Sequence, residues 1–271
     1  MLLLAKLLLV PAFVAGLTVS ARRWGTRVGG VLTALPMVAG PALVFYALEQ
    51  GDDFASEAAR MTLLGILATA AWCVAYAHSA RRVQWPLSVA VGCIAFAAVG
   101  TVVLRVAVGR TGALMLTVAG LLAAHGLLPA VIRWRQPLRR PDWDLPMRMA
   151  AAAALVLVLT SLAARLGPSV SGLLAAFPVV TVIVGAFTHA QQGPAGVASY
   201  FRGLLRGLHG FALFCFTFSA ALGALRLGLL ASTLAALAAQ LTAQALLLWR
   251  LTDGSAAPTV PVADTMPGDT Q

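Results

Sequence analysis

The chain is a succession of long apolar stretches separated by short polar segments, and this pattern constrains its fold more than any other feature. Of its 271 residues, 60% are hydrophobic and only 10% are charged. A soluble domain carries about 25% charged residues, because it must cover its surface with them. The composition therefore excludes a soluble enzyme, a disordered chain and a secreted disulfide-rich scaffold. It predicts an integral membrane protein.

Helices are the expected spanning elements, because a helix satisfies its own backbone hydrogen bonds in lipid. The long polar alternation typical of a membrane β-barrel is missing. At about 20 residues per span, the apolar stretches predict an all-α polytopic protein with nine transmembrane helices. These are residues 2–20, 28–49, 60–80, 84–104, 111–132, 147–166, 169–190, 201–222 and 227–250. Cys73, Cys93 and Cys215 lie inside such stretches and are expected to be unpaired and buried.

An internal repeat is the most specific signal in the sequence. An ungapped offset of 142 residues carries Gly25-x4-Gly30-x-Leu32-x-Ala34-x-Pro36-x-Val38 onto Gly167-x4-Gly172-x-Leu174-x-Ala176-x-Pro178-x-Val180. The same offset matches Thr18 with Thr160, Gln50-Gly51 with Gln192-Gly193, Arg60 with Arg202, and Cys73 with Cys215. A composition rich in alanine and leucine does not by itself align glycine, proline, arginine and cysteine in this way. The first helix belongs to the repeat, so we expect it to be retained rather than cleaved as a signal peptide.

The repeat is expected to be inverted in the membrane. Four spans return the chain to its starting side and the fifth crosses again, so the second unit begins on the opposite face. The positions of the arginines support this count of helices. Most of them lie in alternate connections, and cytoplasmic connections of membrane proteins are enriched in arginine and lysine. These arginines are Arg22, Arg23, Arg27, Arg81, Arg82, Arg133, Arg135, Arg139, Arg140, Arg148, Arg202, Arg206 and Arg250. We therefore expect a multi-pass protein of a bacterial inner membrane, with its N-terminus outside and its C-terminus in the cytoplasm.

The domain organisation follows from the repeat. Residues 1–108 are the first four-helix repeat, and residues 109–140 are a linking transmembrane helix with a cytoplasmic loop. Residues 141–252 are the second four-helix repeat. Residues 253–271 are rich in Pro, Gly, Thr and Asp, lack periodicity, and are expected to form a disordered cytoplasmic tail.

Two prolines mark the candidate substrate path. Pro36 and Pro178 interrupt the second and seventh predicted helices, and proline removes a backbone donor and clashes with the preceding turn. Carbonyls freed in lipid need another partner or a water-lined cavity. The nearby Thr33 and Thr181 are candidate lining residues, and Gly30 and Gly172 belong to the same motif. The alternative is structural, because membrane helices tolerate proline and glycine permits close helix packing.

Basic side chains near the ends of helices are further candidates. Arg60 and Arg202 open the third and eighth helices and would lie at opposite faces, either as entrance residues for an anionic group or as interfacial anchors. Arg206 and His209 continue one basic face from Arg202. Structural interpretations are favoured for three further polar residues. His125 is expected to be a hydrogen-bonded packing residue, and Gln240 and Gln244 are expected to hydrogen-bond between helices.

Several classes of function lack support in the sequence. No Asp or Glu falls in the middle of a predicted span, so a carboxylate proton relay is hard to build. A phosphate loop, a His/Cys metal cluster and a Ser/His/Asp set are missing. We therefore expect neither an enzyme nor a resident cofactor or metal, and no nucleic-acid partner.

The second unit resembles a known family. Ser171-Gly172-Leu173-Leu174-Ala175-Ala176-Phe177-Pro178, the polar turn Gln191-Gln192-Gly193 and the following Arg202 look like the GlpM family of small bacterial inner-membrane proteins. The resemblance covers about 80 residues per unit and implies four helices in each. It implies no substrate and no catalytic residue, and the linking helix lies outside it.

These observations favour a small-molecule permease or exporter that works by alternating access between inverted repeats. Its expected partners are the lipid bilayer and an unidentified solute, for which an anionic or neutral molecule is favoured. The sequence leaves open whether the protein forms a homo-oligomer. The alternative is a membrane assembly or structural factor for envelope polysaccharide or lipid metabolism, which would not transport. An intramembrane enzyme is the third class, and no acid/base pair supports it.

Overall fold

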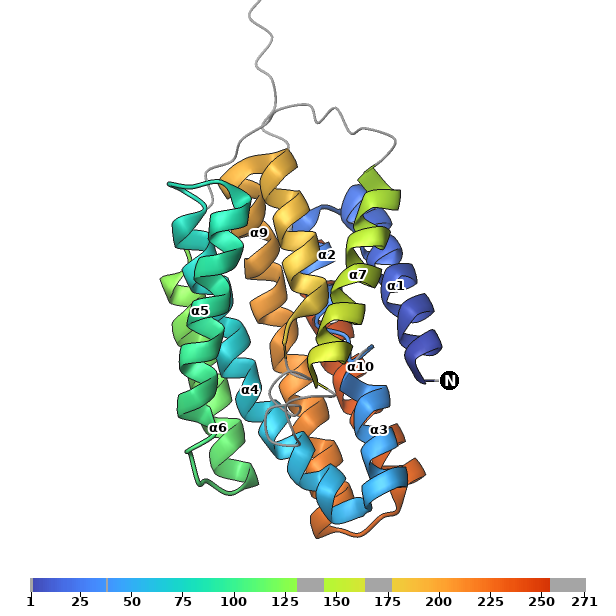
Figure 1. The fold of residues 1–271 in the computed structure, drawn as a ribbon. Helices are drawn as coiled ribbons and strands as arrows, with labels where there is room; N and C mark the ends of the chain where they lie inside the picture. The colour runs from blue at the N-terminus through green and yellow to red at the C-terminus, as the bar shows by residue number, and fades with distance from the viewer. Residues whose placement is uncertain (1, 38, 131–143, 164–176, 254–271) are drawn as a thin grey trace, which may run out of the picture.

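The computed structural model describes residues 2–37, 39–130, 144–163 and 177–253. These residues form a bundle of α-helices, and none of them forms a strand (Figure 1). The helices are α1 (Leu2–Trp24), α2 (Thr26–Thr33), α3 (Ala39–Gln50), α4 (Asp52–Ser79), α5 (Trp85–Val103), α6 (Arg110–Leu127), α7 (Asp144–Ala163), α9 (Val179–Ser219) and α10 (Leu229–Asp253). A π-helical turn, Ala220–Ala224, continues α9. The expected cytoplasmic loop and C-terminal tail fall largely outside the described residues.

Five stretches are long and apolar enough to cross a membrane, which agrees with a membrane-embedded helical protein. They are Asp52–Ser79, Trp85–Val103, Arg110–Leu127, Val179–Ala224 and Leu229–Trp249. The fourth has 46 residues and would be about 70 Å long if straight, against a hydrocarbon thickness of about 30 Å. It folds back at Gly193, whose backbone is non-helical with φ 66° and ψ −167°. Its two arms run side by side in Figure 1. They are in close contact, since a Cβ atom added to Gly185 in one arm would lie 3.3 Å from the ring of Phe201 in the other.

The sequence predicts ten-residue connections at residues 50–59 and 191–200. This prediction is wrong in length, because nearly all residues of both segments are helical. α3 ends at Gln50 and α4 begins at Asp52, with only Gly51 between them at φ 89°. Gly193, 142 residues later, is the matching break in α9. Positive φ is readily available only to glycine, so one residue is enough to reverse the chain. Asp52 and Asp53 lie in the first turn of α4, where negative charge stabilises the helix, so these polar residues do not signal a loop.

The expected break at Pro36 is confirmed. The single helix predicted over 28–49 is two helices, and residues 34–37 after the first of them are outside any helix. Phe177 and Pro178 are likewise non-helical, and α9 begins directly after them at Val179. The segment before Phe177 lies outside the described residues, so a break within a helix at Pro178 stays a prediction. Another predicted end is corrected, because α6 stops at Leu127 rather than at residue 132. Leu128 is extended, with ψ 136°, as expected for a residue that precedes a proline.

Two kinds of packing hold the centre of the bundle. An aromatic cluster joins α4 to the second arm of α9, with Trp72 and Tyr76 against Phe201 at ring-centroid distances of 5.5 and 5.4 Å. Glycines allow α2 to lie very close to the same arm of α9. A Cβ atom added to Gly30 would overlap the carbonyl oxygen of Tyr200. Gly30 therefore has the close-packing role that was the alternative to a site role. α6 packs against both α4 and α9.

Candidate functional site

The break at Pro36 and the start of α9 after Pro178 meet at one partly open cavity of the bundle. Its volume is about 100 Å³. Thr33 and Pro36 line it from the break between α2 and α3, and Pro178 and Thr181 line it from the start of α9. α2 and α3 follow one another along the length of the bundle, so this junction lies near mid-height (Figure 1). The structure thus brings together four of the residues that the sequence singled out.

The rest of the cavity wall combines hydroxyls with aromatic rings. Thr62 and Thr69 face it from α4, the rings of Phe13, Phe177 and Phe211 contribute aromatic surface, and aliphatic side chains form the rest of the wall. We call it the threonine cavity. Among the described residues that line it, none carries a formal charge. Across the described chain there is also no group of three or more His, Cys, Asp or Glu side chains placed to hold a metal ion.

The threonine hydroxyls present mainly acceptor lone pairs to the cavity. Thr33 donates its proton to the Gly29 carbonyl at 2.8 Å, and Thr62 donates to the Ala58 carbonyl at 2.8 Å. Each hydroxyl has a single proton, and these back-bonds to the preceding turn are the usual habit of a helical threonine. A solute in the cavity therefore meets hydrogen-bond acceptors here rather than donors.

Two glutamines satisfy the broken end of α2. Gln240 donates from Nε2 to the Ala34 carbonyl at 2.8 Å, and Gln244 donates to the Val31 carbonyl at 3.1 Å. Both side chains come from α10 and are buried. The expectation that this pair hydrogen-bonds between helices is confirmed. Carbonyls that lose their helical donor at a break need such partners in an apolar surrounding.

Tyr200 stands between the threonine cavity and a second, smaller one. Its hydroxyl donates to Oγ1 of Thr33 at 3.1 Å. Its ring is only 1% exposed. Tyr200 also lines the second cavity, of about 20 Å³, a volume that suits about one water molecule.

A cluster of ion pairs lines this second cavity, with its carboxylate buried and one of its arginines, Arg22, partly exposed. Asp144, at the first residue of α7, is fully buried and binds Arg22 of α1 at 2.7 Å and Arg148 of α7 at 2.8 Å. Gln191 of α9 donates to the same carboxylate and accepts from Arg148 at 3.1 Å. Arg148 also lies 4.8 Å from the Phe187 ring centroid. We call Arg22, Asp144, Arg148 and Gln191 the Asp144 cluster.

The cluster keeps its carboxylate ionised. Burial by itself would raise the pKa of Asp144, but hydrogen bonds from Arg148 and Arg22 outweigh it and hold the pKa below its ordinary value. Sequence reasoning missed this group, because Asp144 precedes the predicted span. The available signal was the spacing of Asp144 and Arg148, four residues apart, which places opposite charges on one helix face.

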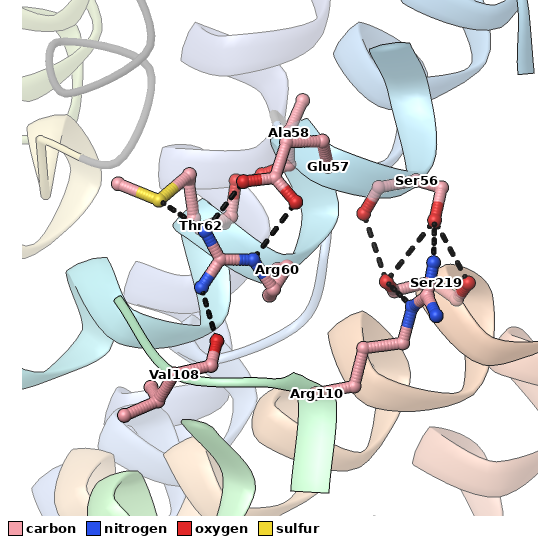
Figure 2. A network of polar contacts seen from close by, with 9 residues as sticks. Ser56, Glu57, Ala58, Arg60, Thr62, Val108, Arg110 and Ser219 are labelled. Atoms are coloured by element: carbon pink, nitrogen blue, oxygen red, sulfur yellow. Dashed lines mark hydrogen bonds and ion pairs between the residues drawn. The ribbon is translucent and has the colours of Figure 1, made fainter. Parts of the chain in front are cut away.

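The matched arginines Arg60 and Arg202 bind opposite ends of α6. Arg60 donates to the Val108 carbonyl before α6 at 2.7 Å and pairs with Glu57 (Figure 2). Arg202 donates to the carbonyls of Leu128 and Pro129 after α6, at 3.1 and 2.8 Å. These contacts hold the linking helix in place, as anchors would. An entrance role for either arginine stays a prediction.

A second polar network in Figure 2 closes the same end of the bundle as Arg60. Arg110, the first residue of α6, donates to the hydroxyls of Ser219 and Ser56, both at 3.0 Å. The Ser219 hydroxyl in turn donates to the Ser56 carbonyl at 2.8 Å. The network joins α4, α6 and α9 in a buried position, and it was not expected from the sequence.

The remaining candidates lie away from the threonine cavity. Arg206 and His209 are half-buried on α9, and His209 contacts the carbonyls of its own helix at Leu205 and Arg206. His125 lies in the last turn of α6 rather than deep in a span. Gly172 falls outside the described residues. None of the described ones lines the cavity, so a part in a substrate path stays a prediction for them.

Cys73 and Cys215 are fully buried and Cys93 is half-buried, and all three are free thiols.

Comparison of the chain with protein-family models, curated proteins and solved structures finds no match.

Proposed function

We propose that the protein is a small-molecule permease whose substrate site is the threonine cavity. The observation that carries the proposal is that the break at Pro36 and the start of α9 after Pro178 meet at one cavity, near mid-height in the bundle. Secondary carriers typically bind their substrates at discontinuous helices near the membrane midplane. A scaffold has no need of a cavity there, and its helices would be expected to meet in close packing.

The repeat supports alternating access as the mechanism. The helix boundaries follow the 142-residue offset, since Gly51 and Gly193 are both single-residue breaks with positive φ. α1 and α7, which correspond in the repeat, pack against one another. Arg60 and Arg202 bind the two ends of α6, which would place the repeats in opposite orientations about this helix. We propose that one repeat rocks against the other and opens the cavity to each side in turn.

An unbiased comparison of solutes tests the proposal. Cells expressing the wild-type chain, an empty vector, Thr181→Leu or Thr101→Leu are compared for intracellular and released small molecules. Leucine at 181 fills the cavity, whereas Thr101 is exposed on α5 and serves as the matched control. We expect at least one solute to differ between wild type and vector, Thr181→Leu to resemble the vector, and Thr101→Leu to resemble the wild type. Identical solute profiles for wild type and vector would favour the non-transporting assembly factor instead.

A further inference from the structure

We infer that the threonine cavity binds a small uncharged solute that carries hydroxyl or amide N–H donors. The inference rests on the proposed function and names its substrate class. It narrows the expected range of anionic or neutral solutes to neutral ones.

The hydrogen-bonding groups of the wall give the first argument. Thr33 and Thr62 use their protons on their own helices. Thr62 keeps its oxygen lone pairs for a solute, whereas one lone pair of Thr33 already accepts from Tyr200. A hydroxyl or N–H of a solute is the complement of such a group. The charged oxygens of an anion only accept hydrogen bonds and would meet these lone pairs unfavourably.

Charge gives the second argument. No described residue that lines the cavity carries a formal charge, and four of the arginines are paired with other groups. Arg60 and Arg202 bind the ends of α6, and Arg22 and Arg148 bind Asp144. Moving an unpaired ion from water into an apolar site is expensive, so a charged solute would lack compensation.

Size gives the third argument. An engineered cavity of about 150 Å³ holds benzene. A cavity of about 100 Å³ therefore suits a solute of about four to six non-hydrogen atoms. The rings of Phe13, Phe177 and Phe211 provide an apolar wall for its carbon skeleton.

Solute entry into proteoliposomes tests the inference. Glycerol and acetamide are uncharged donors of this size, and isethionate and tetramethylammonium are ions of similar size. Swelling is followed by light scattering for the wild type, Thr62→Val and the matched control Thr101→Val, against protein-free liposomes. We expect faster entry of glycerol or acetamide only, a fall of about two- to tenfold in Thr62→Val, the range of one hydrogen bond, and no fall in the control.

The outcomes separate this inference from the proposed function. Faster entry of isethionate or tetramethylammonium than of glycerol and acetamide would overturn the inferred substrate class. It would not contradict the proposal that the protein is a permease. No entry of glycerol or acetamide, with solute differences still present in cells, would overturn the class as well. Absence of both signals would overturn the proposed function and, with it, the inference.

A second observation, the Asp144 cluster, carries a separate proposal. We propose that the cluster and Tyr200 form the closed gate between the threonine cavity and the end of the bundle where α1 ends and α7 begins. One buried carboxylate joins α1, α7 and α9 there. Tyr200 then separates the cluster from Thr33, so a solute passing this way must displace both.

An exposed ion pair at the opposite end of the bundle provides a comparison with the Asp144 cluster. Arg226 and Asp53 form an ion pair at 2.9 Å, but their side chains are 62% and 79% exposed. Exposed pairs of this kind contribute little, whereas breaking a buried pair leaves an uncompensated charge. The two ion pairs therefore provide a test variant and a matched control.

Cysteine labelling measures the gate without requiring transport. Cys73, Cys93 and Cys215 are replaced by alanine, Thr33→Cys is introduced, and a membrane-impermeant maleimide is applied from each side of sealed vesicles. We expect Asp144→Asn to raise the labelling rate about tenfold from the side of the cluster, equivalent to about 1.4 kcal/mol. Tyr200→Phe, which removes only a hydroxyl, is expected to raise it less, and Arg226→Ala is expected not to change it from that side.

Two results would overturn the gate. One is an unchanged rate in both Asp144→Asn and Tyr200→Phe. The other is an equal rise in Arg226→Ala, which would indicate general loosening. Because Tyr200→Phe leaves the ion pairs intact, it keeps the test decisive where Asp144→Asn fails to fold.

Discussion

Substitution of Gly30 by alanine tests how tightly α2 is held against α9. The added Cβ would overlap the Tyr200 carbonyl oxygen and lie 2.8 Å from the Leu204 nitrogen. Both are backbone atoms of a helix, so neither can rotate away. α2 must therefore move outward, and overpacking of this kind costs about 1–3 kcal/mol. At about 2 kcal/mol, Tm is expected to fall by about 4–8 °C for a protein of this size.

Thermal unfolding in detergent, followed by size-exclusion chromatography, measures the effect. Gly16→Ala is the matched control, because nothing lies within 4 Å of an added Cβ at that helical position. We expect Gly16→Ala to leave Tm unchanged or raise it, since alanine favours helix over glycine. A Tm for Gly30→Ala equal to that of Gly16→Ala would refute the close approach of α2 and α9.

Three further predictions address other parts of the molecule. Gln240→Leu leaves the Ala34 carbonyl without its donor, so it is expected to destabilise the protein by about 1–3 kcal/mol in thermal unfolding; a loss no larger than that of the exposed Gln84→Leu would contradict this. The lowered pKa of Asp144 contributes stability above the ordinary carboxyl pKa that is lost as pH falls through the lowered value. Tm of the wild type should therefore drop more steeply than that of Asp144→Asn below about pH 4, and parallel curves would argue against the ionised cluster. Reporter fusions after residues 54 and 138 are expected to report outside and inside respectively, and the same side for both would exclude the inverted topology.

Local chemistry made the break at Pro36 and the helix start after Pro178 predictable. Proline lacks a backbone donor wherever it lies, so its effect on a helix needs no knowledge of the rest of the fold. The same holds for Gln240 and Gln244, since polar amides in an apolar helix must find partners. Their partners, the carbonyls of α2, follow from the break itself.

Long-range contacts account for what the sequence did not reveal. Asp144 looks like a loop residue until Arg22, 122 positions earlier, is placed beside it. The partners of Arg60 and Arg202 are backbone carbonyls, which carry no side-chain signature. Polar residues around Gly51 and Gly193 suggest long connections, but a glycine with positive φ reverses the chain in one residue, so helix extends to either side of it.

Alternating access to the threonine cavity is the central claim, and two-sided labelling of Thr181→Cys in the cysteine-free background tests it most directly. Thr181 lines the cavity and is 4% exposed, so its reaction with an impermeant maleimide reports opening. We predict labelling from both sides of sealed vesicles, with the rates shifting in opposite directions when Asp144→Asn opens the cluster. Labelling from neither side, or from the same single side in every variant, would contradict the claim.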